Sequence, residues 1–135
     1  MLALEYIGEG MHRIAYRLLF FGKPSGLVLK LCKKRPVHSC TEMKALEYWK
    51  NDPLVAPHLP TVYFHDEQTG SLVMQEYAPG ATRRSVRHIE AYLRKKLSKQ
   101  SIVLRPKNLG LTETGSVVLL DMGEMLPKGL WRLPL

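Results

Sequence analysis

The stretch SIVLRPKNLGLTETGSVVLLDMG, residues 101–123, places two short apolar runs on either side of Glu113-Thr114-Gly115. This pattern predicts a β-hairpin, because a glycine-containing turn lets two apolar strands pair. Asn108 comes directly before the first run and Asp121 directly after the second. Since a hairpin brings its ends together, we expect these two side chains to offer oxygen ligands to Mg²⁺ beside a bound phosphate. The simpler interpretation is a turn asparagine and an aspartate that ends a strand.

The residues before the hairpin, 83–100, carry the strongest helix pattern of the chain. An apolar side chain recurs at spacings of three and four, at Val86, Ile89, Leu93 and Leu97. Nine of the 20 Lys and Arg residues fall within residues 81–108, where Glu90 is the only acid, so this segment carries the whole net charge of +8. Solvated helix faces are often basic, but this concentration points to an anionic partner.

Apolar or alternating runs predict five strands upstream, at residues 2–7, 14–21, 27–32, 61–65 and 71–77. Residues 22–26 are interpreted as a turn, because glycine and proline supply its backbone angles. A helix follows the third strand, capped by Ser39 or Thr41 and ended near Pro53. The order of three strands, a helix, two strands, a helix and a hairpin favours an antiparallel sheet with segregated helices, which is the α+β class.

Length and composition restrict the class of protein. With 135 residues, 45% hydrophobic and 24% charged, the chain has the size and composition of one globular domain rather than of a disordered protein. No apolar run approaches the roughly 18 residues that a membrane span needs. Cys32 and Cys40 are the only cysteines, so no disulfide framework is expected, and a reducing, cytoplasmic location is the simplest.

Two features near the N-terminus suit contact with an anionic group. Gly8-Glu9-Gly10 lies between the first two strands, where glycines let a hairpin backbone approach a phosphate with its N–H groups. Many hairpin turns contain the same pattern, so it is weak evidence alone. Lys30 interrupts an apolar strand and shares a strand face with Val28. It is either the guard of an edge strand or a buried cation with an anionic partner, for which Glu42 is a candidate.

In their order along the chain, these segments resemble the protein-kinase-like fold, and the resemblance covers nearly all of the sequence. The matching segments are Gly8-x-Gly10 with Ala15-Tyr16, Val28-Leu29-Lys30, Glu42, Leu72 to Gly80, Arg105 to Asn108, and Asp121-Met122-Gly123. The last is similar to the Asp-Phe-Gly metal motif of kinases. The resemblance implies a single domain over residues 1–135. Residues 1–77 would form a kinase N-lobe of five antiparallel strands and one helix, and residues 78–135 a minimal C-lobe of one basic helix and a hairpin.

The resemblance also implies roles for residues of the N-terminal part. Gly8 and Gly10 would cover the phosphates of ATP. Lys30 would pair with the α and β phosphates while Glu42 holds it in place. Glu76 would offer a backbone group to adenine.

Three residues of the C-terminal part would complete the site. Ala78 would offer a second backbone group to adenine. Asn108 and Asp121 would hold Mg²⁺, so ATP and Mg²⁺ are the cofactors that the resemblance implies. Lys30, Glu42 and Asp121 would then be the catalytic residues.

Departures from the kinase pattern bear on activity. Arg13 replaces the third glycine of the loop, and Val103 occupies the position of the catalytic aspartate. Valine can neither orient a hydroxyl group nor accept its proton. Residues 124–135 contain no Ala-Pro-Glu motif, so the sequence is either a minimal kinase-like protein or a fragment.

Three functions agree with these features. The first is an ATP- and Mg²⁺-binding pseudokinase whose phosphotransfer is lost or unconventional. The second is an active minimal kinase that phosphorylates a protein bound through the basic segment. The third is a non-enzymatic module that grips an acidic protein surface or a nucleic acid through residues 81–108, with its contacts between Arg83 and Lys107.

Overall fold

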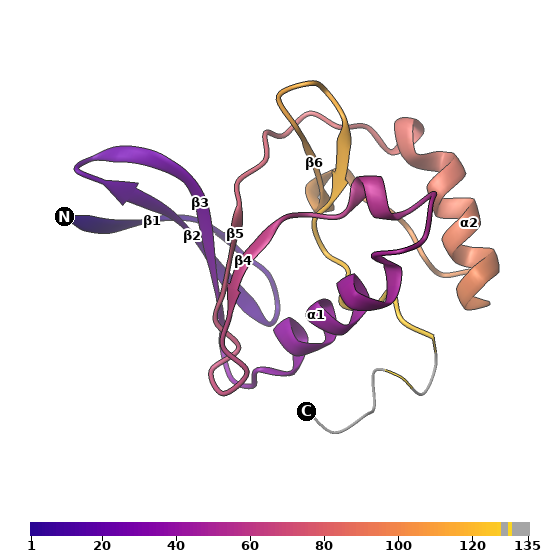
Figure 1. The fold of residues 1–135 in the computed structure, drawn as a ribbon, viewed down its shortest axis with the longest axis horizontal. Helices are drawn as coiled ribbons and strands as arrows, with labels where there is room; N and C mark the ends of the chain where they lie inside the picture. The colour runs from indigo at the N-terminus through magenta and orange to yellow at the C-terminus, as the bar shows by residue number, and fades with distance from the viewer. Residues whose placement is uncertain (128–129, 131–135) are drawn as a thin grey trace. The chain divides into compact units, whose positions relative to one another are not determined.

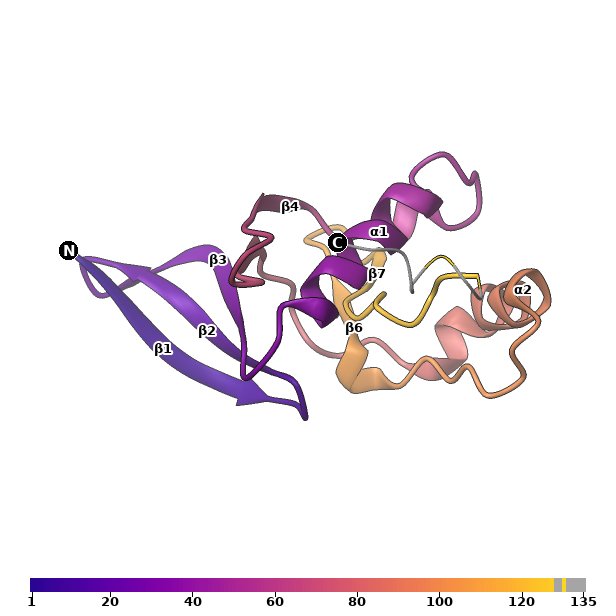
Figure 2. The same ribbon diagram turned by 90° about the horizontal axis from the view of Figure 1, so that it is seen from below.

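The computed structural model describes residues 1–127 and residue 130. These residues divide into two compact units, and each unit has its own fold. The first contains residues 1–40 and 61–76, and the second contains residues 41–60 and 77–127 together with residue 130. Figure 1 traces the chain through both units, and Figure 2 shows it turned by 90°. No helix of the described residues is long and apolar enough to cross a membrane.

The first unit is built on a five-stranded sheet, which Figure 1 shows in indigo to rose. The strands are β1 (Leu2–Glu9), β2 (Arg13–Phe20), β3 (Lys23–Cys32), β4 (Val62–His65) and β5 (Leu72–Gln75). Their spatial order is β1-β2-β3-β5-β4, so β3 lies at the centre. Every neighbouring pair is antiparallel. The predicted α+β class and the antiparallel sheet of five strands are therefore confirmed.

The connection between β2 and β3 is shorter than the sequence predicts. Phe20 pairs with Lys23, so the turn consists of Phe21 and Gly22 rather than of residues 22–26. Both turn residues have positive φ, 51° and 78°, as a two-residue hairpin turn requires. Gly26, with φ of 82°, lies on β3 where the register with β2 shifts. Pro24 and Gly26, which suggested a longer turn, therefore belong to an irregular strand.

The second unit contains helices and a two-stranded hairpin. The helices are α1 (Val37–Trp49), whose first turn belongs to the first unit, η1 (Ala56–His58), η2 (Arg83–Val86), α2 (Arg87–Leu97) and η3 (Pro106–Asn108). The hairpin pairs β6 (Leu109–Leu111) with β7 (Val117–Leu119) in antiparallel orientation. This confirms the hairpin that the apolar runs predict.

The helices begin and end at other residues than predicted. The carbonyl of Pro36 accepts a hydrogen bond from Cys40 at 3.1 Å, so α1 starts before Ser39 and Thr41, which lie buried within the helix. Neither residue is therefore the cap. The predicted helix over residues 83–100 divides into a 3-10 turn and α2, because Ser98 adopts the left-handed conformation (φ 51°, ψ 41°) and ends the helix.

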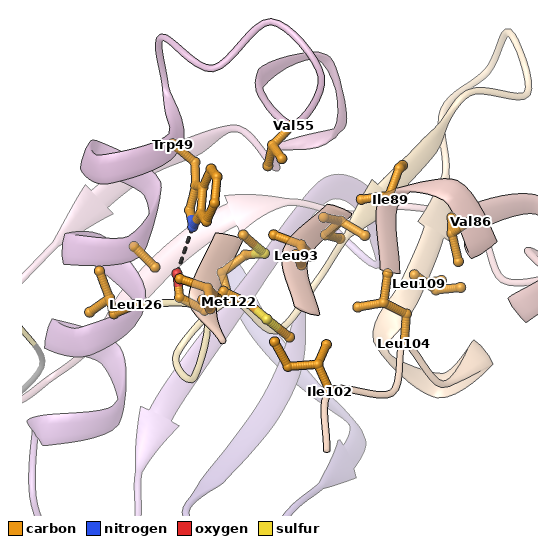
Figure 3. Close-up of a cluster of buried hydrophobic side chains, with 14 of the residues drawn as sticks. Trp49, Val55, Val86, Ile89, Leu93, Ile102, Leu104, Leu109, Met122 and Leu126 are labelled. Carbon is orange, nitrogen blue, oxygen red and sulfur yellow. Dashed lines mark hydrogen bonds between the residues drawn. The ribbon is translucent and has the colours of Figure 1, made fainter. Parts of the chain in front are cut away.

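The core of the second unit is one cluster of buried apolar side chains (Figure 3). Its members come from α1, α2, the hairpin and the segment that follows it, and they include the predicted stripe Val86, Ile89, Leu93 and Leu97. Trp49, which is 2% exposed, donates its indole Nε1–H to the carbonyl oxygen of Met125 at 2.6 Å. That bond, dashed in Figure 3, ties α1 to the segment after the hairpin.

We predict that Trp49→Phe destabilises the protein by about 1–3 kcal/mol, because it leaves the buried Met125 carbonyl without its donor. The free energy of unfolding is measured by urea denaturation. Tyr48→Phe is the control, since the neighbouring Tyr48 is 46% exposed and should change stability by no more than about 0.5 kcal/mol. Equal effects of the two substitutions would contradict a stabilising role for the indole bond.

Candidate functional site

The β6–β7 hairpin brings the backbone of Asn108 close to that of Asp121. Leu109 pairs with Leu119, and the N–H of Leu120 donates to the carbonyl oxygen of Asn108 at 2.8 Å. Asp121 is the next residue along the chain, so the predicted juxtaposition at the end of the hairpin is present in the backbone. Asp121 is exposed and Asn108 is partly exposed, so a ligand can reach both.

A short 3-10 turn holds Asn108. Pro106 lies in the first turn of η3 and fixes its own φ, while the N–H of Asn108 donates to the carbonyl of Arg105 at 2.9 Å. The side-chain amide of Asn108 forms no hydrogen bond with any residue of the described part of the chain. Its oxygen is therefore available to a cation.

The segment Asp121-Met122-Gly123 is anchored to α1 by a buried carboxylate. Glu42 is 1% exposed, and its Oε2 accepts the N–H of Met122 at 3.3 Å. The Met122 side chain is fully buried in the apolar cluster, as Figure 3 shows. Asp121 Oδ1 accepts a long bond of 3.5 Å from the N–H of Gly123. Glu42 and the buried side chain of Met122 thus fix the backbone next to Asp121, whose own side chain is exposed.

The donor set at the hairpin end fits a magnesium ion that is also bound to phosphate. Mg²⁺ prefers oxygen ligands and usually takes one or two side chains, with waters and phosphate oxygens completing its shell. Asn108 and Asp121 supply two such oxygens. No group of three or more His, Cys, Asp and Glu residues gathers anywhere in residues 1–127, so a metal cage made of protein ligands alone is absent there.

In the first unit, Lys30 occupies the centre of the sheet. It lies on β3 opposite Ala15 of β2 and Leu72 of β5. Strand alternation puts it on the same face as Val28, which is 7% exposed, and Lys30 itself is half-buried. Because β3 has a neighbour on each side, Lys30 is not the guard of an edge strand. Its pairing with Glu42 stays a prediction, since the two residues belong to different units.

Gly8 and Gly10 lie where neither packing nor backbone conformation requires glycine. Neither has a positive φ, and no heavy atom of the described residues lies within 4 Å of a Cβ built on either. Gly110 differs, because a Cβ there would lie 2.5 Å from the Cβ of Tyr77. The open space beside Gly8 and Gly10 is what a ligand approaching the backbone of this hairpin would need.

Sequence reasoning missed an ion-pair cluster on the sheet. Arg17 donates from Nε to both carboxylate oxygens of Glu76, at 3.0 and 2.9 Å, and its Nη1 contacts Glu5. Glu76, and then Glu5, raise the pKa of Arg17 by hydrogen bonding to its charged form. The N–H of Glu76 donates to the carbonyl of Gly26 at 2.7 Å. A ligand that meets the Glu76 backbone would therefore use its carbonyl oxygen.

Ala78 is already engaged through its backbone. Its N–H donates to the carbonyl of Leu111 at 3.2 Å, and its carbonyl accepts the N–H of Leu111 at 2.8 Å. An adenine ring that used the Ala78 N–H would have to displace the longer of these two bonds. The role of Ala78 in adenine binding stays a prediction.

The structure divides the basic residues of the segment 81–108 into two groups. Arg83 and Arg94 pair with Glu90, Lys99 donates to the carbonyls of Glu124 and Leu126, and Lys96 lies 5.7 Å from the centre of the Tyr92 ring. The other group is exposed and forms no ion pair within residues 1–127: Arg84, Arg87, Lys95, Arg105 and Lys107. The chain itself therefore neutralises only part of the positive charge.

Comparison of the chain with protein-family models and with curated proteins found no match.

Proposed function

We propose that the chain binds ATP with Mg²⁺ in a kinase-like site and that its phosphotransfer is lost or unconventional. The observation that carries this proposal is the placement of Asp121-Met122-Gly123. The hairpin puts Asn108 next to the residue that precedes Asp121, and the buried carboxylate of Glu42 binds the next residue, Met122. In the kinase-like fold, the asparagine of the catalytic loop and the aspartate of the Asp-Phe-Gly motif hold the metal ions, and Asn108 and Asp121 would take these roles here.

The first unit supports the nucleotide part of the proposal. Lys30 is a half-buried cation on the central strand, suited to the α and β phosphates. The open backbone at Gly8 and Gly10 suits close approach of phosphate oxygens. When bound, Mg²⁺ would neutralise charge on the phosphates, while Asn108 and Asp121 would supply its protein ligands.

The loop before Asn108 supports the loss of ordinary catalysis. Ile102 and Leu104 are buried, and Val103 between them is 37% exposed. Val103 is therefore accessible at the position that the resemblance assigns to the catalytic aspartate. Its aliphatic side chain accepts no proton from a hydroxyl group, so general-base assistance from this position is absent.

Lys30→Ala and Asp121→Ala should each abolish Mg²⁺-dependent ATP binding, because they remove the phosphate cation and a metal ligand. Calorimetric titration and the thermal shift caused by ATP, each with and without Mg²⁺, measure the effect. Lys23→Ala on the same strand and Glu113→Ala in the hairpin turn are the matched controls, since both residues are exposed. A wild-type chain that neither binds ATP nor gains thermal stability from it would overturn the proposal.

The alternative of an active minimal kinase is tested at Val103. Because the side chain is exposed, Val103→Asp introduces no buried charge, and it should raise transfer from radiolabelled ATP by about 100-fold if a base is what the loop lacks. Val103→Asn is the control, with the same shape and no proton acceptor of comparable strength. Measurable transfer by the wild type that Val103→Asp does not raise would favour the active kinase, and no transfer by the wild type would contradict it.

A second candidate function is a binding module, with or without ATP. The exposed cations Arg84, Arg87 and Lys95 favour it, because the only acid of η2 and α2, Glu90, is 4% exposed and bound to Arg83 and Arg94. Tyr92, the only Phe, Tyr or Trp residue of the segment, packs its ring against the apolar cluster and beside Lys96, so the ring gives no free stacking platform for bases. An acidic protein surface is therefore the proposed partner, and a nucleic acid is the alternative.

Reversal of Arg84, Arg87 and Lys95 to Glu should weaken binding of polyglutamate by at least about 10-fold and flatten its salt dependence. Fluorescence anisotropy at several salt concentrations measures both. Reversal of Lys23, Lys34 and Arg35 is the control, since it changes the net charge equally in the first unit. Equal loss in the two variants would mean that only net charge matters. Tighter binding of a DNA duplex than of polyglutamate would favour the nucleic acid.

A further inference from the structure

Glu90, which is buried, lies at the centre of a polar network that joins α2 to the loop of residues 101–108. Its Oε1 and Oε2 accept hydrogen bonds from Nη2 and Nε of Arg83 at 3.0 and 3.2 Å, and Oε1 forms an ion pair with Nη2 of Arg94 at 3.2 Å. Oε2 also accepts the backbone N–H of Leu104 at 2.8 Å. The Arg83 hydrogen bonds lower the pKa of Glu90 most, and the Leu104 N–H contributes, while burial opposes both.

The two arginines of this network differ in one contact. Arg94 also donates its Nε to the carbonyl oxygen of Ile102 at 2.8 Å, whereas Arg83 reaches Glu90 but not the loop. The network therefore holds the loop by two backbone groups, the carbonyl of Ile102 and the N–H of Leu104. These groups lie on either side of Val103.

The restraint is close to Asn108 along the chain. Ile102 and Leu104 are both fixed in the apolar cluster, as Figure 3 shows. Between Leu104 and Asn108 the chain has little freedom, because Pro106 fixes one φ and the η3 turn closes with a hydrogen bond from Asn108 to Arg105. A rotation of the loop at residues 102–104 would therefore move the Asn108 side chain.

The need to neutralise the buried carboxylate of Glu90 does not by itself explain why Arg94 also binds the loop. Arg83 alone makes two hydrogen bonds to the carboxylate. The extra bond from Arg94 goes to the loop and not to Glu90. We propose that Glu90 and Arg94 are positioning residues that hold the 101–108 loop so that Asn108 can bind Mg²⁺. The proposal rests on the proposed ATP·Mg²⁺ site.

The test compares Arg94→Met with Arg83→Met in the full chain. Each variant leaves Glu90 with one arginine, and only Arg94→Met releases the Ile102 carbonyl. Arg83 makes more hydrogen bonds to Glu90, so Arg83→Met should lower the melting temperature at least as much as Arg94→Met does.

The Mg²⁺ concentration that half-saturates ATP binding should rise about 10-fold in Arg94→Met, as for other residues that orient a metal ligand, and less than twofold in Arg83→Met. If a methionine variant fails to fold, Arg94→Lys and Arg83→Lys keep the charge and make the same comparison.

Amide hydrogen exchange separates this inference from the function on which it rests. Exchange of the N–H groups of Leu104, Arg105, Lys107 and Asn108 should quicken in Arg94→Met and stay near the wild-type rate in Arg83→Met. The proposal would be wrong if Arg94→Met left the amide exchange rates unchanged, or if both variants raised the required Mg²⁺ concentration equally. The network would then only stabilise the fold. Failure of the wild type to bind ATP would overturn the metal role together with the proposed function, while the exchange rates would still decide whether Arg94 restrains the loop.

Discussion

A carboxylate withdrawn from water must keep its hydrogen bonds, and this constraint shapes the second unit. Two carboxylates are buried there, Glu42 and Glu90, at 1% and 4% exposure. Each accepts the backbone N–H of a loop residue, Met122 in one case and Leu104 in the other. The two loops that carry Asp121 and Asn108 are thus both tied to helices by buried charges. A loop fixed in this way can present a polar side chain without the support of a larger domain.

The same constraint explains how the positive charge is distributed. The buried Glu90 binds Arg83 and Arg94, and no other acid lies within residues 81–108. The remaining cations of η2 and α2 face solvent because they have no acid to meet there. Because its one acid is buried, the basic segment has two of its arginines held in an ion-pair network, while its exposed cations are not neutralised by the segment.

Local patterns were sufficient for much of the fold. The apolar stripe from Val86 to Leu97 and the hairpin after Asn108 follow from spacings of two to four residues, and both are present. The Phe21-Gly22 turn was missed because Pro24 and Gly26 after it suggested a longer loop. The bonds of Glu90 to Leu104 and of Arg17 to Glu76 join residues 14 and 59 positions apart. Tertiary packing sets such contacts, so no spacing rule could have identified them.

The chain passes from one unit to the other after residues 40, 60 and 76, and this has a consequence for folding during synthesis. Strands β1 to β3 can pair as they leave the ribosome, and β5 completes the sheet once residue 76 has been made. Trp49 and Val55 have been made by then, yet the core that buries them extends to Leu126. The nascent chain therefore carries exposed aromatic and aliphatic side chains until residue 126 has been made, and these are the groups that chaperones bind.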